Sequence, residues 1–370
     1  MRLRPRRLVP PFFTRPARPR PAPATARRRA RAVVGCGLLA IAAAFAAMGA
    51  AVETSKPEWR DPEYGHRLKQ VRALRAANPA RPLVVAVGSS RTQMGFSPAD
   101  MAFADGVGSP LVYNFGQSGA GPLHILLTVR RLLDAGVKPD ALLVELFPAA
   151  LAADGPAEDL LKPLAVRFSA ADLRRLEPYA AGPARMRREW AGNRAASWHS
   201  LRLVLMSHWQ PGWLPWQKRL SFQWEQMDPF GFTPYPLEAV GGAARGSAVA
   251  RVADQYCGTL ANYRVGGTSE RALREVIAVC RGAGIRVAFY VTPEGPSFQT
   301  LYPPAARATL AAYLDGLIRE AGVPVFDSAG GFDEEAFADG HHLLRAGAAQ
   351  FSRKLADEHL RGWLTANGLP

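Results

Sequence analysis

The chain has 370 residues, of which 48% are hydrophobic, enough to build the core of one large domain or two smaller ones. Its formal net charge is +15, but residues 1–31 hold eleven arginines and no acid, so the rest of the chain carries only +4. This uneven distribution argues against a nucleic-acid-binding protein, because the part of the chain that can fold is only mildly basic.

The N-terminal residues predict a membrane anchor. Residues 1–31 are rich in arginine and proline and predict a disordered cytoplasmic tail. Residues 32–52 carry no charge over a length that can cross about 30 Å of hydrocarbon as a helix. The arginines before this segment predict a signal anchor that leaves residues 53–370 outside the cytoplasm. Cleavage at Gly49-Ala50-Ala51 and a buried soluble helix are the alternatives.

Alternating strands and helices predict the rest of the fold. A juxtamembrane connector at 53–79, with a helix at about 66–77, leads into five buried strands, each a short run of apolar and β-branched residues. The predicted strands are 83–87, 111–115, 141–146, 285–291 and 323–327. The predicted helices are 123–135 with Gly136 at its end, 268–281 with the capping pattern Thr268-Ser269-Glu270, 304–321 and 345–365. This order predicts a five-stranded parallel sheet with helices on both faces.

The composition changes near residue 150. Residues 151–250 hold six of the eight tryptophans and many arginines, with no strand of clear period two, which predicts a mainly helical insertion or cap. Its predicted helices are 156–164, 170–177, 182–195 and 198–208. Trp209, Trp213 and Trp216 have three interpretations: stacking on sugar rings, contact with a membrane interface, or packing in the core of the cap.

The three cysteines leave one question open. Cys36 lies in the predicted membrane span, whereas Cys257 and Cys280 would face an oxidising compartment. These two cysteines could therefore form a disulfide or remain as buried thiols. No spacing of cysteine and histidine resembles a zinc site, and we expect neither a metal nor another cofactor.

Two short motifs point to a serine nucleophile. The strand Leu83–Val87 is followed by Gly88-Ser89-Ser90, which places a serine at the carboxyl edge of the sheet, where open α/β sheets bind their ligands. Asp339 and His342 lie three residues apart in a glycine-containing loop. A carboxylate at this spacing can orient the imidazole that a serine nucleophile needs as its base.

With these motifs the chain resembles the SGNH/GDSL hydrolase family, over about 80–150 and 251–366. The Gly-Asp-Ser block of that family is similar to Gly88-Ser89-Ser90, its Asn and oxyanion-hole Gly to Asn114 and Gly119, and its Asp-x-x-His to Asp339 and His342. The resemblance implies a flavodoxin-like, three-layer α/β/α fold. It also implies Ser90 as nucleophile, His342 as base, Asp339 as orienting acid, and the N–H groups of Ser90 and Gly119 as oxyanion donors.

The chain departs from the family after the third strand. The family has Gly-x-Asn-Asp there, and its Asn completes the oxyanion hole, but residues 144–150 read Val-Glu-Leu-Phe-Pro-Ala-Ala. Loss of one oxyanion donor typically slows a reaction by about 10²–10³. Arg91 is a candidate replacement, and Asn114 is a candidate auxiliary residue.

Four polar residues near these motifs have simpler interpretations. We expect Ser89 to be a hydrogen-bonding residue of the loop and Glu145 to be structural. We expect His124 to be packed or to cap a helix, and His341 to face solvent.

The predicted function is that of a membrane-anchored esterase or O-acyltransferase acting on acyl esters, most plausibly acetyl esters, of an envelope glycan. The resemblance to the divergent members of the family that modify envelope polysaccharides also implies that machinery as a partner. The alternative is a catalytically inactive scaffold or glycan-binding protein with the same fold, which the absent asparagine favours and the intact Asp-x-x-His disfavours.

Overall fold

The computed structural model describes residues 23–55, 57–104, 106, 108–153, 166–180, 182–195 and 197–369. It is an α/β structure with one five-stranded sheet in the order β2-β1-β3-β4-β5, and every strand pair is parallel. The predicted parallel sheet is therefore confirmed. The strands are β1 Leu83–Val87, β2 Leu111–Asn114, β3 Ala141–Leu146, β4 Arg286–Val291 and β5 Val325–Asp327.

The central strand β1 determines where a ligand site can form. All five of its residues are buried, and it pairs with β2 on one side and with β3 on the other. The chain order reverses between β1 and β3. In open parallel sheets the crevice beyond the carboxyl ends of these two strands is the usual ligand site.

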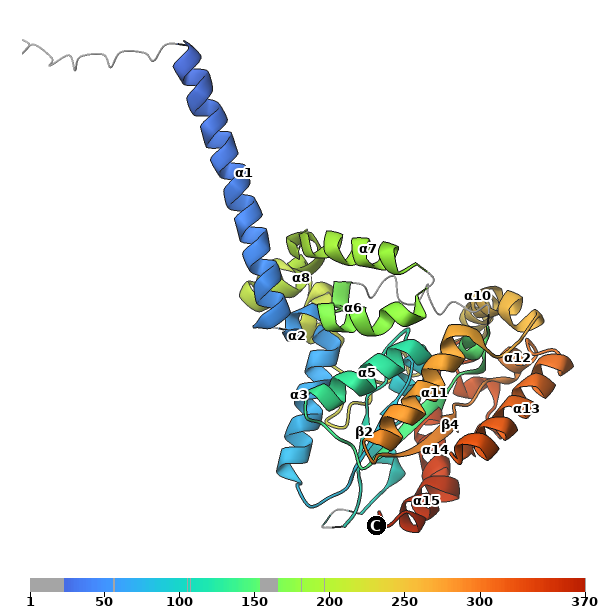
Figure 1. Ribbon diagram of the computed structural model, residues 1–370. Helices are drawn as coiled ribbons and strands as arrows, with labels where there is room; N and C mark the ends of the chain where they lie inside the picture. Colours follow the sequence, from blue (N-terminus) through green and yellow to red (C-terminus); the bar gives the residue numbers. More distant parts are fainter. Residues whose placement is uncertain are drawn as a thin grey trace, which may run out of the picture.

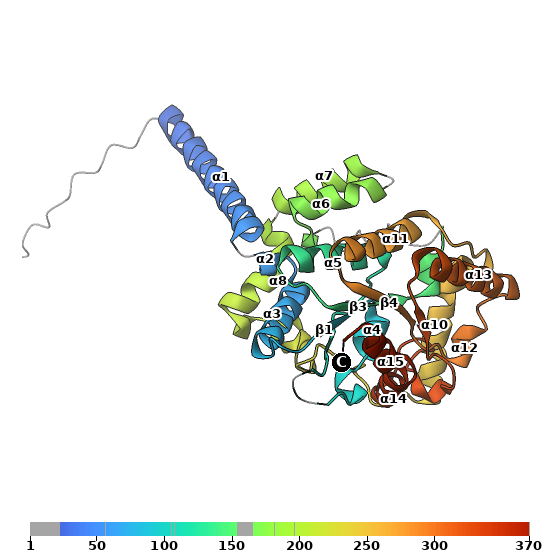
Figure 2. The ribbon, with the colours of Figure 1, turned by 60° about the horizontal axis from the view of Figure 1, so that its bottom comes forward.

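Side chains alternate between two cores, one on each face of the sheet. Val85 and Val87 pack on one face with residues of α3, α5, α11 and α13, whereas Val84 and Ala86 pack on the other with residues of α14 and α15. Figure 2 shows α5 and α11 on one side of the strands and α4, α14 and α15 on the other. These helices are α3 Pro62–Ala77, α4 Ser90–Gly95, α5 Pro122–Asp134, α11 Gly267–Gly282, α13 Pro304–Ala321, α14 Arg345–Leu355 and α15 Arg361–Ala366.

Several helix ends differ from the sequence prediction. Helix α3 begins four residues early, because Asp61 caps its first turn and Pro62 suits the first helical position. The capping pattern at Thr268 is not used: α11 begins at Gly267, and the Thr268 hydroxyl donates to a backbone carbonyl at 3.3 Å. The last predicted helix is divided by a π-helical segment, Ala356–Leu360, between α14 and α15.

The insertion is helical, as expected, but it includes a helix that the sequence analysis missed. Helix α10, Gly242–Ala261, crosses the predicted boundary at residue 250. The predicted helix 156–164 lies outside the described residues, and no strand occurs in the described part of the insertion. The other helices are α6 Ala170–Leu176, α7 Pro183–Ala195, α8 Ser197–Trp209 and the short α9 Leu220–Gln223, and a further short helix, α12 Pro296–Gln299, follows β4.

Residues 228–233 of the insertion cover the edge strand β2. The backbone N–H of Asn114 donates to the Phe230 carbonyl at 2.8 Å, and the buried Arg67 guanidinium donates to the carbonyls of Asn114 and Gly231 at 2.9 and 2.6 Å. Gly231 has a positive φ of 84°, and a Cβ there would lie 2.2 Å from the Asn114 oxygen. Only glycine fits this close approach between the insertion and the sheet.

Helix α1, Pro23–Thr54, projects from the rest of the structure (Figure 1). It is long and apolar enough to span a membrane, with a mean hydropathy of 2.2 over a window that is not buried in protein. It is therefore not the buried core helix of the alternative interpretation. Residues 23–31, which we expected in a disordered tail, are helical, and residues 1–22 lie outside the described part of the chain.

The inner end of α1 is fixed to the fold. Val52 is buried with two leucines of α8, and Glu53 forms ion pairs with Arg60 and Arg194, both at 3.3 Å. Glu53 also accepts a hydrogen bond from the backbone N–H of Ala170 at 2.7 Å. The helix thus continues into the domain through packed, paired side chains and a short helix, α2 Pro57–Arg60.

The described cysteines are all free thiols. Cys36 and Cys257 are exposed and Cys280 is buried, so the disulfide left open by the sequence is absent. Only Cys280 fits the alternative of a buried thiol.

Candidate active site

The site begins at the sharp turn after β1. A Cβ on Gly88 would lie 1.9 Å from the Thr92 hydroxyl oxygen and 2.3 Å from a Glu145 carboxylate oxygen, so only glycine fits there. Ser89 then caps α4, with its hydroxyl oxygen accepting from the Arg91 N–H at 3.1 Å. Ser90 is consequently the first residue of a helix that starts at the carboxyl edge of the sheet.

Glu145, near the end of β3, stabilises this turn through hydrogen bonds. Its buried carboxylate accepts hydrogen bonds from the Ser89 N–H at 2.5 Å, the Ser89 hydroxyl at 3.0 Å and the Thr92 hydroxyl at 2.7 Å. These three hydrogen bonds take the place of the hydrogen bonds to water that the carboxylate gives up on burial. The structural roles expected for Ser89 and Glu145 fit this geometry.

Ser90, His342 and Asp339 form one hydrogen-bonded line. The Ser90 Oγ lies 2.8 Å from His342 Nε2, and His342 Nδ1 lies 2.8 Å from Asp339 Oδ2, although Ser90 and His342 are 252 residues apart in the chain. Because an ionised carboxylate only accepts, Nδ1 carries the proton and Nε2 is left to accept from Ser90. This is the arrangement in which an imidazole can act as base toward a serine.

The Asp339 carboxylate is oriented by its own loop. Its Oδ1 accepts from the backbone N–H groups of His341 at 3.2 Å and His342 at 2.9 Å, which turns Oδ2 toward the imidazole. Burial alone would raise the pKa of Asp339, but the hydrogen bond from His342 outweighs burial and lowers this pKa. The orienting group is therefore charged throughout the neutral range.

A cavity of about 210 Å³ opens over Ser90. Ser90, Gly119 and His342, three of the candidate site residues, all line it. Gly119 has a φ of +74° in the loop after β2. The Ser90 N–H is in the first turn of α4, where no intrahelical acceptor exists. Further lining residues are Ser89, Arg91, Ala120, Phe147, Ala149, Ala150, Gln255, Tyr256 and His341.

Asn114, the candidate auxiliary residue, joins two backbone segments near the site and does not line the cavity. It is fully buried, and its amide nitrogen donates to the carbonyls of Thr92 at 2.8 Å and Phe96 at 2.6 Å. Its side-chain oxygen accepts from the Gly116 N–H at 2.8 Å. Asn114 thus ties α4 to the loop that carries Gly119, and its polar atoms are not directed at a substrate.

Arg91, the candidate replacement for the missing oxyanion donor, lines the cavity, but it is buried and paired within the fold. One terminal nitrogen pairs with Glu294 at 3.1 Å, and the other donates to the carbonyls of Thr292 at 2.8 Å and Pro293 at 3.2 Å. Its guanidinium stacks 4.4 Å from the ring centroid of Phe147. Arg91 therefore joins the start of α4 to the end of β4.

The two other histidines near the site motifs, His341 and His124, are both buried. His341 was expected to face solvent, but it is only 5% exposed and packs against Tyr256, Phe298 and the ring of His342. Burial, followed by the charge of His342, lowers the pKa of His341 to about 2. His124 is packed, as expected, and its ring lies 3.1 Å from the Gln117 side-chain oxygen, outside the residues that line the cavity.

The sequence analysis missed the contribution of α10. Gln255 and Tyr256 of this helix form a wall of the cavity. Apolar residues at 249, 252, 256 and 260 recur at helical spacing and could have revealed the helix. Among the described residues, Asp339, His341 and His342 also form a group whose ligand atoms lie within 4.8 Å of one another, but two of its three members are engaged in the line to Ser90.

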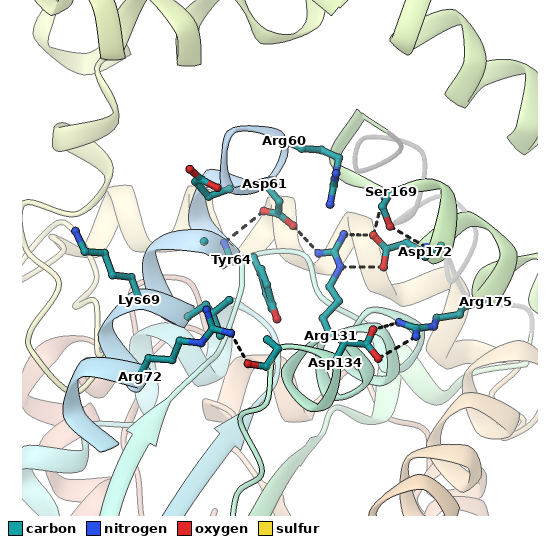
Figure 3. Close-up of a pocket in the computed structure, with 15 residues that line it drawn as sticks. Arg60, Asp61, Tyr64, Lys69, Arg72, Arg131, Asp134, Ser169, Asp172 and Arg175 are labelled. Atoms are coloured by element: carbon teal, nitrogen blue, oxygen red, sulfur yellow. Dashed lines mark hydrogen bonds and ion pairs between the residues drawn. The ribbon is translucent and has the colours of Figure 1, made fainter. Parts of the chain in front are cut away.

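A larger cavity, of about 620 Å³, lies between α3, α5 and α6, away from Ser90. Figure 3 shows that its central cation is already paired: Arg131 bonds Asp61 at 2.8 Å and Asp172 at 2.7 Å. Arg175 on its rim is paired with Asp134. These ion pairs join three helices, and none of the described residues that line this cavity pairs a nucleophile with a base.

Fold and site together define an α/β protein with a hydrogen-bonded serine–histidine–aspartate line at the carboxyl edge of a parallel sheet. No protein-family model matches the chain, and no curated protein matches it. The assignment of function therefore depends on the chemistry of the site itself.

Proposed function

We propose that the chain is a membrane-anchored serine esterase or O-acyltransferase of the SGNH type, acting on short acyl esters of an extracytoplasmic glycan. The observation that carries this proposal is the line from Ser90 through His342 to Asp339, with both hydrogen bonds at 2.8 Å. Remote parts of the chain rarely bring these three groups together at a strand edge without a chemical use.

The proposed reaction follows from the geometry. Ser90 Oγ attacks the carbonyl carbon of the ester while His342 Nε2 takes the hydroxyl proton. The N–H groups of Ser90 and Gly119 donate to the oxyanion that forms. The ester C–O bond then breaks, and His342 returns the proton to the departing sugar oxygen. Water or a second hydroxyl group attacks the acyl-enzyme, with His342 again as base, and Ser90 is released.

The size of the cavity favours a short acyl group. Its volume of about 210 Å³ is below the 300–1,000 Å³ typical of pockets that enclose drug-sized ligands. Phe147 and three alanines form much of its apolar lining. An acetyl group fits a cavity of this size, and a long fatty acyl chain does not.

Helix α1 supports the proposed location. It supplies a segment long and apolar enough to span a membrane, and the arginines at its N-terminal side favour a cytoplasmic N-terminus. The enzyme domain would then lie outside the cytoplasmic membrane, where it meets envelope glycans and the machinery that makes them.

A serine-directed phosphonate probe tests the proposal. The full chain, purified in detergent, should be labelled at Ser90 and should hydrolyse p-nitrophenyl acetate. The complete chain is needed because Val52 and Glu53 are part of the packed domain. Ser90→Ala should abolish both signals, whereas Ser247→Ala, at an exposed serine of α10, should leave both unchanged.

Two outcomes would contradict the proposal. Unchanged turnover in Ser90→Ala would exclude Ser90 as the nucleophile. Absence of labelling in the folded wild-type chain would favour the catalytically inactive scaffold. Adding a sugar acceptor to the assay separates a hydrolase, which releases free acid only, from a transferase, which forms acyl-sugar.

A further inference from the structure

A group of exposed apolar side chains lies in the insertion. Seven large hydrophobic side chains outside α1 are exposed in the described part of the chain, and five of them lie between residues 203 and 222. We call these five residues the aromatic platform: Leu203, Trp209, Trp213, Trp216 and Phe222. The exposed fractions of the three tryptophans are 56%, 75% and 41%. These tryptophans do not pack in the core of the cap, which removes one of their three interpretations.

The aromatic platform begins beside the end of α1. Helix α8, which carries Leu203 and Trp209, packs against the last turns of α1 through Leu201, Leu205 and Val52. Figure 1 shows α8 next to the inner end of α1. The ring centroid of Trp209 lies 6.4 Å from that of Trp59, which itself packs against the Val52 cluster.

This position corresponds to the headgroup layer of a membrane spanned by α1. The apolar segment of α1 ends at Val52, and the next residue, Glu53, is fixed to the domain by ion pairs. The headgroup region on each side of a bilayer is about 5–8 Å thick. Trp209 is connected to the end of the span through Trp59, and tryptophan is a preferred side chain of the headgroup region.

Exposed cations belong to the same segment as the aromatic platform. Arg202 on α8 and Lys218 after Trp216 are exposed, and the Arg219 guanidinium lies over the ring of Trp216 at 5.6 Å from its centroid. Membrane surfaces that contain anionic lipids attract such cations. Exposed indole rings flanked by cations are more favourably placed at an anionic membrane surface than in water.

We propose that the aromatic platform lies in the headgroup region of the membrane that α1 spans, as a second contact that fixes the orientation of the domain. This inference rests on the membrane anchoring proposed above, and not on the chemistry at Ser90. The occupant of the surface is the lipid headgroup layer next to α1.

Fluorescence quenching tests this contact. The full chain is placed in nanodiscs of phosphatidylcholine and phosphatidylglycerol whose acyl chains carry bromine either near the headgroup or near the bilayer centre. Tryptophan emission should be quenched more by the shallow bromines. Combining Trp209→Phe, Trp213→Phe and Trp216→Phe should remove most of this quenching. Trp363→Phe should not, because Trp363 lies on α15, far from α1 in Figure 1.

Cysteine labelling in the same nanodiscs separates this inference from the anchoring it needs. Cys36 of α1 should be protected from a water-soluble maleimide, whereas the exposed Cys257 should react. If Cys36 is protected and the triple variant is quenched as strongly as the wild type, the platform does not touch lipid. If Cys36 reacts freely, anchoring and platform both fail. Emission that responds to a soluble glycan and not to bromolipid would overturn the inference in favour of sugar stacking.

Discussion

Asp339→Asn is the most informative substitution, because the structure fixes how the new side chain must sit. The Asp339 Oδ1 accepts two backbone N–H groups, at 2.9 and 3.2 Å, and an asparagine oxygen can keep both bonds. The amide nitrogen then takes the place of Oδ2 and points at His342 Nδ1. A nitrogen that donates there forces the imidazole proton onto Nε2, which now faces Ser90 as a donor and cannot accept its proton.

Asp339→Asn should lower the reaction rate strongly and the stability of the fold only slightly. Asparagine in place of the acid of such a triad lowers kcat by about 10⁴, or about 5.4 kcal/mol of transition-state stabilisation. The backbone bonds that orient the loop are kept, so the fold should remain. KM should change little, because the substitution alters the proton transfer and not the contacts of the bound ester.

The measurement is kcat and KM for p-nitrophenyl acetate with the full chain, together with the thermal unfolding midpoint. Asp333→Asn is the matched control, because Asp333 is an exposed acid nearby whose side chain caps nothing. A variant that keeps kcat within tenfold of the wild type, at an unchanged midpoint, would refute the reasoning. His342 would then not depend on Asp339 for its orientation.

Three further substitutions test packing and charge, each read from urea or thermal unfolding. Burial lowers the pKa of His124 to about 4 from an ordinary 6.5, so the unfolded chain takes up a proton first and stability falls as pH drops from 6.5 to 4. Between pH 8 and pH 5 the wild type should lose about 2 kcal/mol of its free energy of unfolding through His124, and His124→Gln should remove this loss. An unchanged pH dependence in the variant would contradict this. Gly88→Ala should cost about 3 kcal/mol through its clash with the Thr92 hydroxyl, whereas Gly192→Ala, with open space around it, should cost nothing. Arg131→Leu should cost about 3–5 kcal/mol, since it removes the closest cation from two buried carboxylates; a loss below about 1 kcal/mol would show that water reaches them.

The sequence predicted those parts of the fold and site that depend on local pattern. The buried run of β1 and the Gly88 turn indicated where a strand ends and a helix starts, and these two features place Ser90. The Asp339 and His342 spacing is local too, because one loop supplies both groups. Their meeting with Ser90 follows from a parallel sheet, whose strands present all their carboxyl ends at one edge.

The residues that the sequence analysis misplaced depend on distant partners. Arg91 is buried because Glu294, about 200 residues later, neutralises it, and no local pattern reports such a pair. His341 is buried because α10 supplies Tyr256 as its neighbour, and α10 was itself overlooked. Helix α10 crosses the boundary at residue 250, which was predicted from composition. Composition is an average over many residues, so it does not locate the ends of a single helix that lines the cavity.

The cover over strand β2 makes the helical insertion inseparable from the sheet. The Phe230 carbonyl occupies the outward N–H of Asn114 at the open edge of β2, a group that would otherwise be free to pair with another molecule. An engineered chain from which residues 151–250 are excised would bare this edge and leave Arg67 without its Gly231 acceptor. We therefore expect such a shortened chain to be less stable at this edge, and the insertion is part of the domain and not a detachable module.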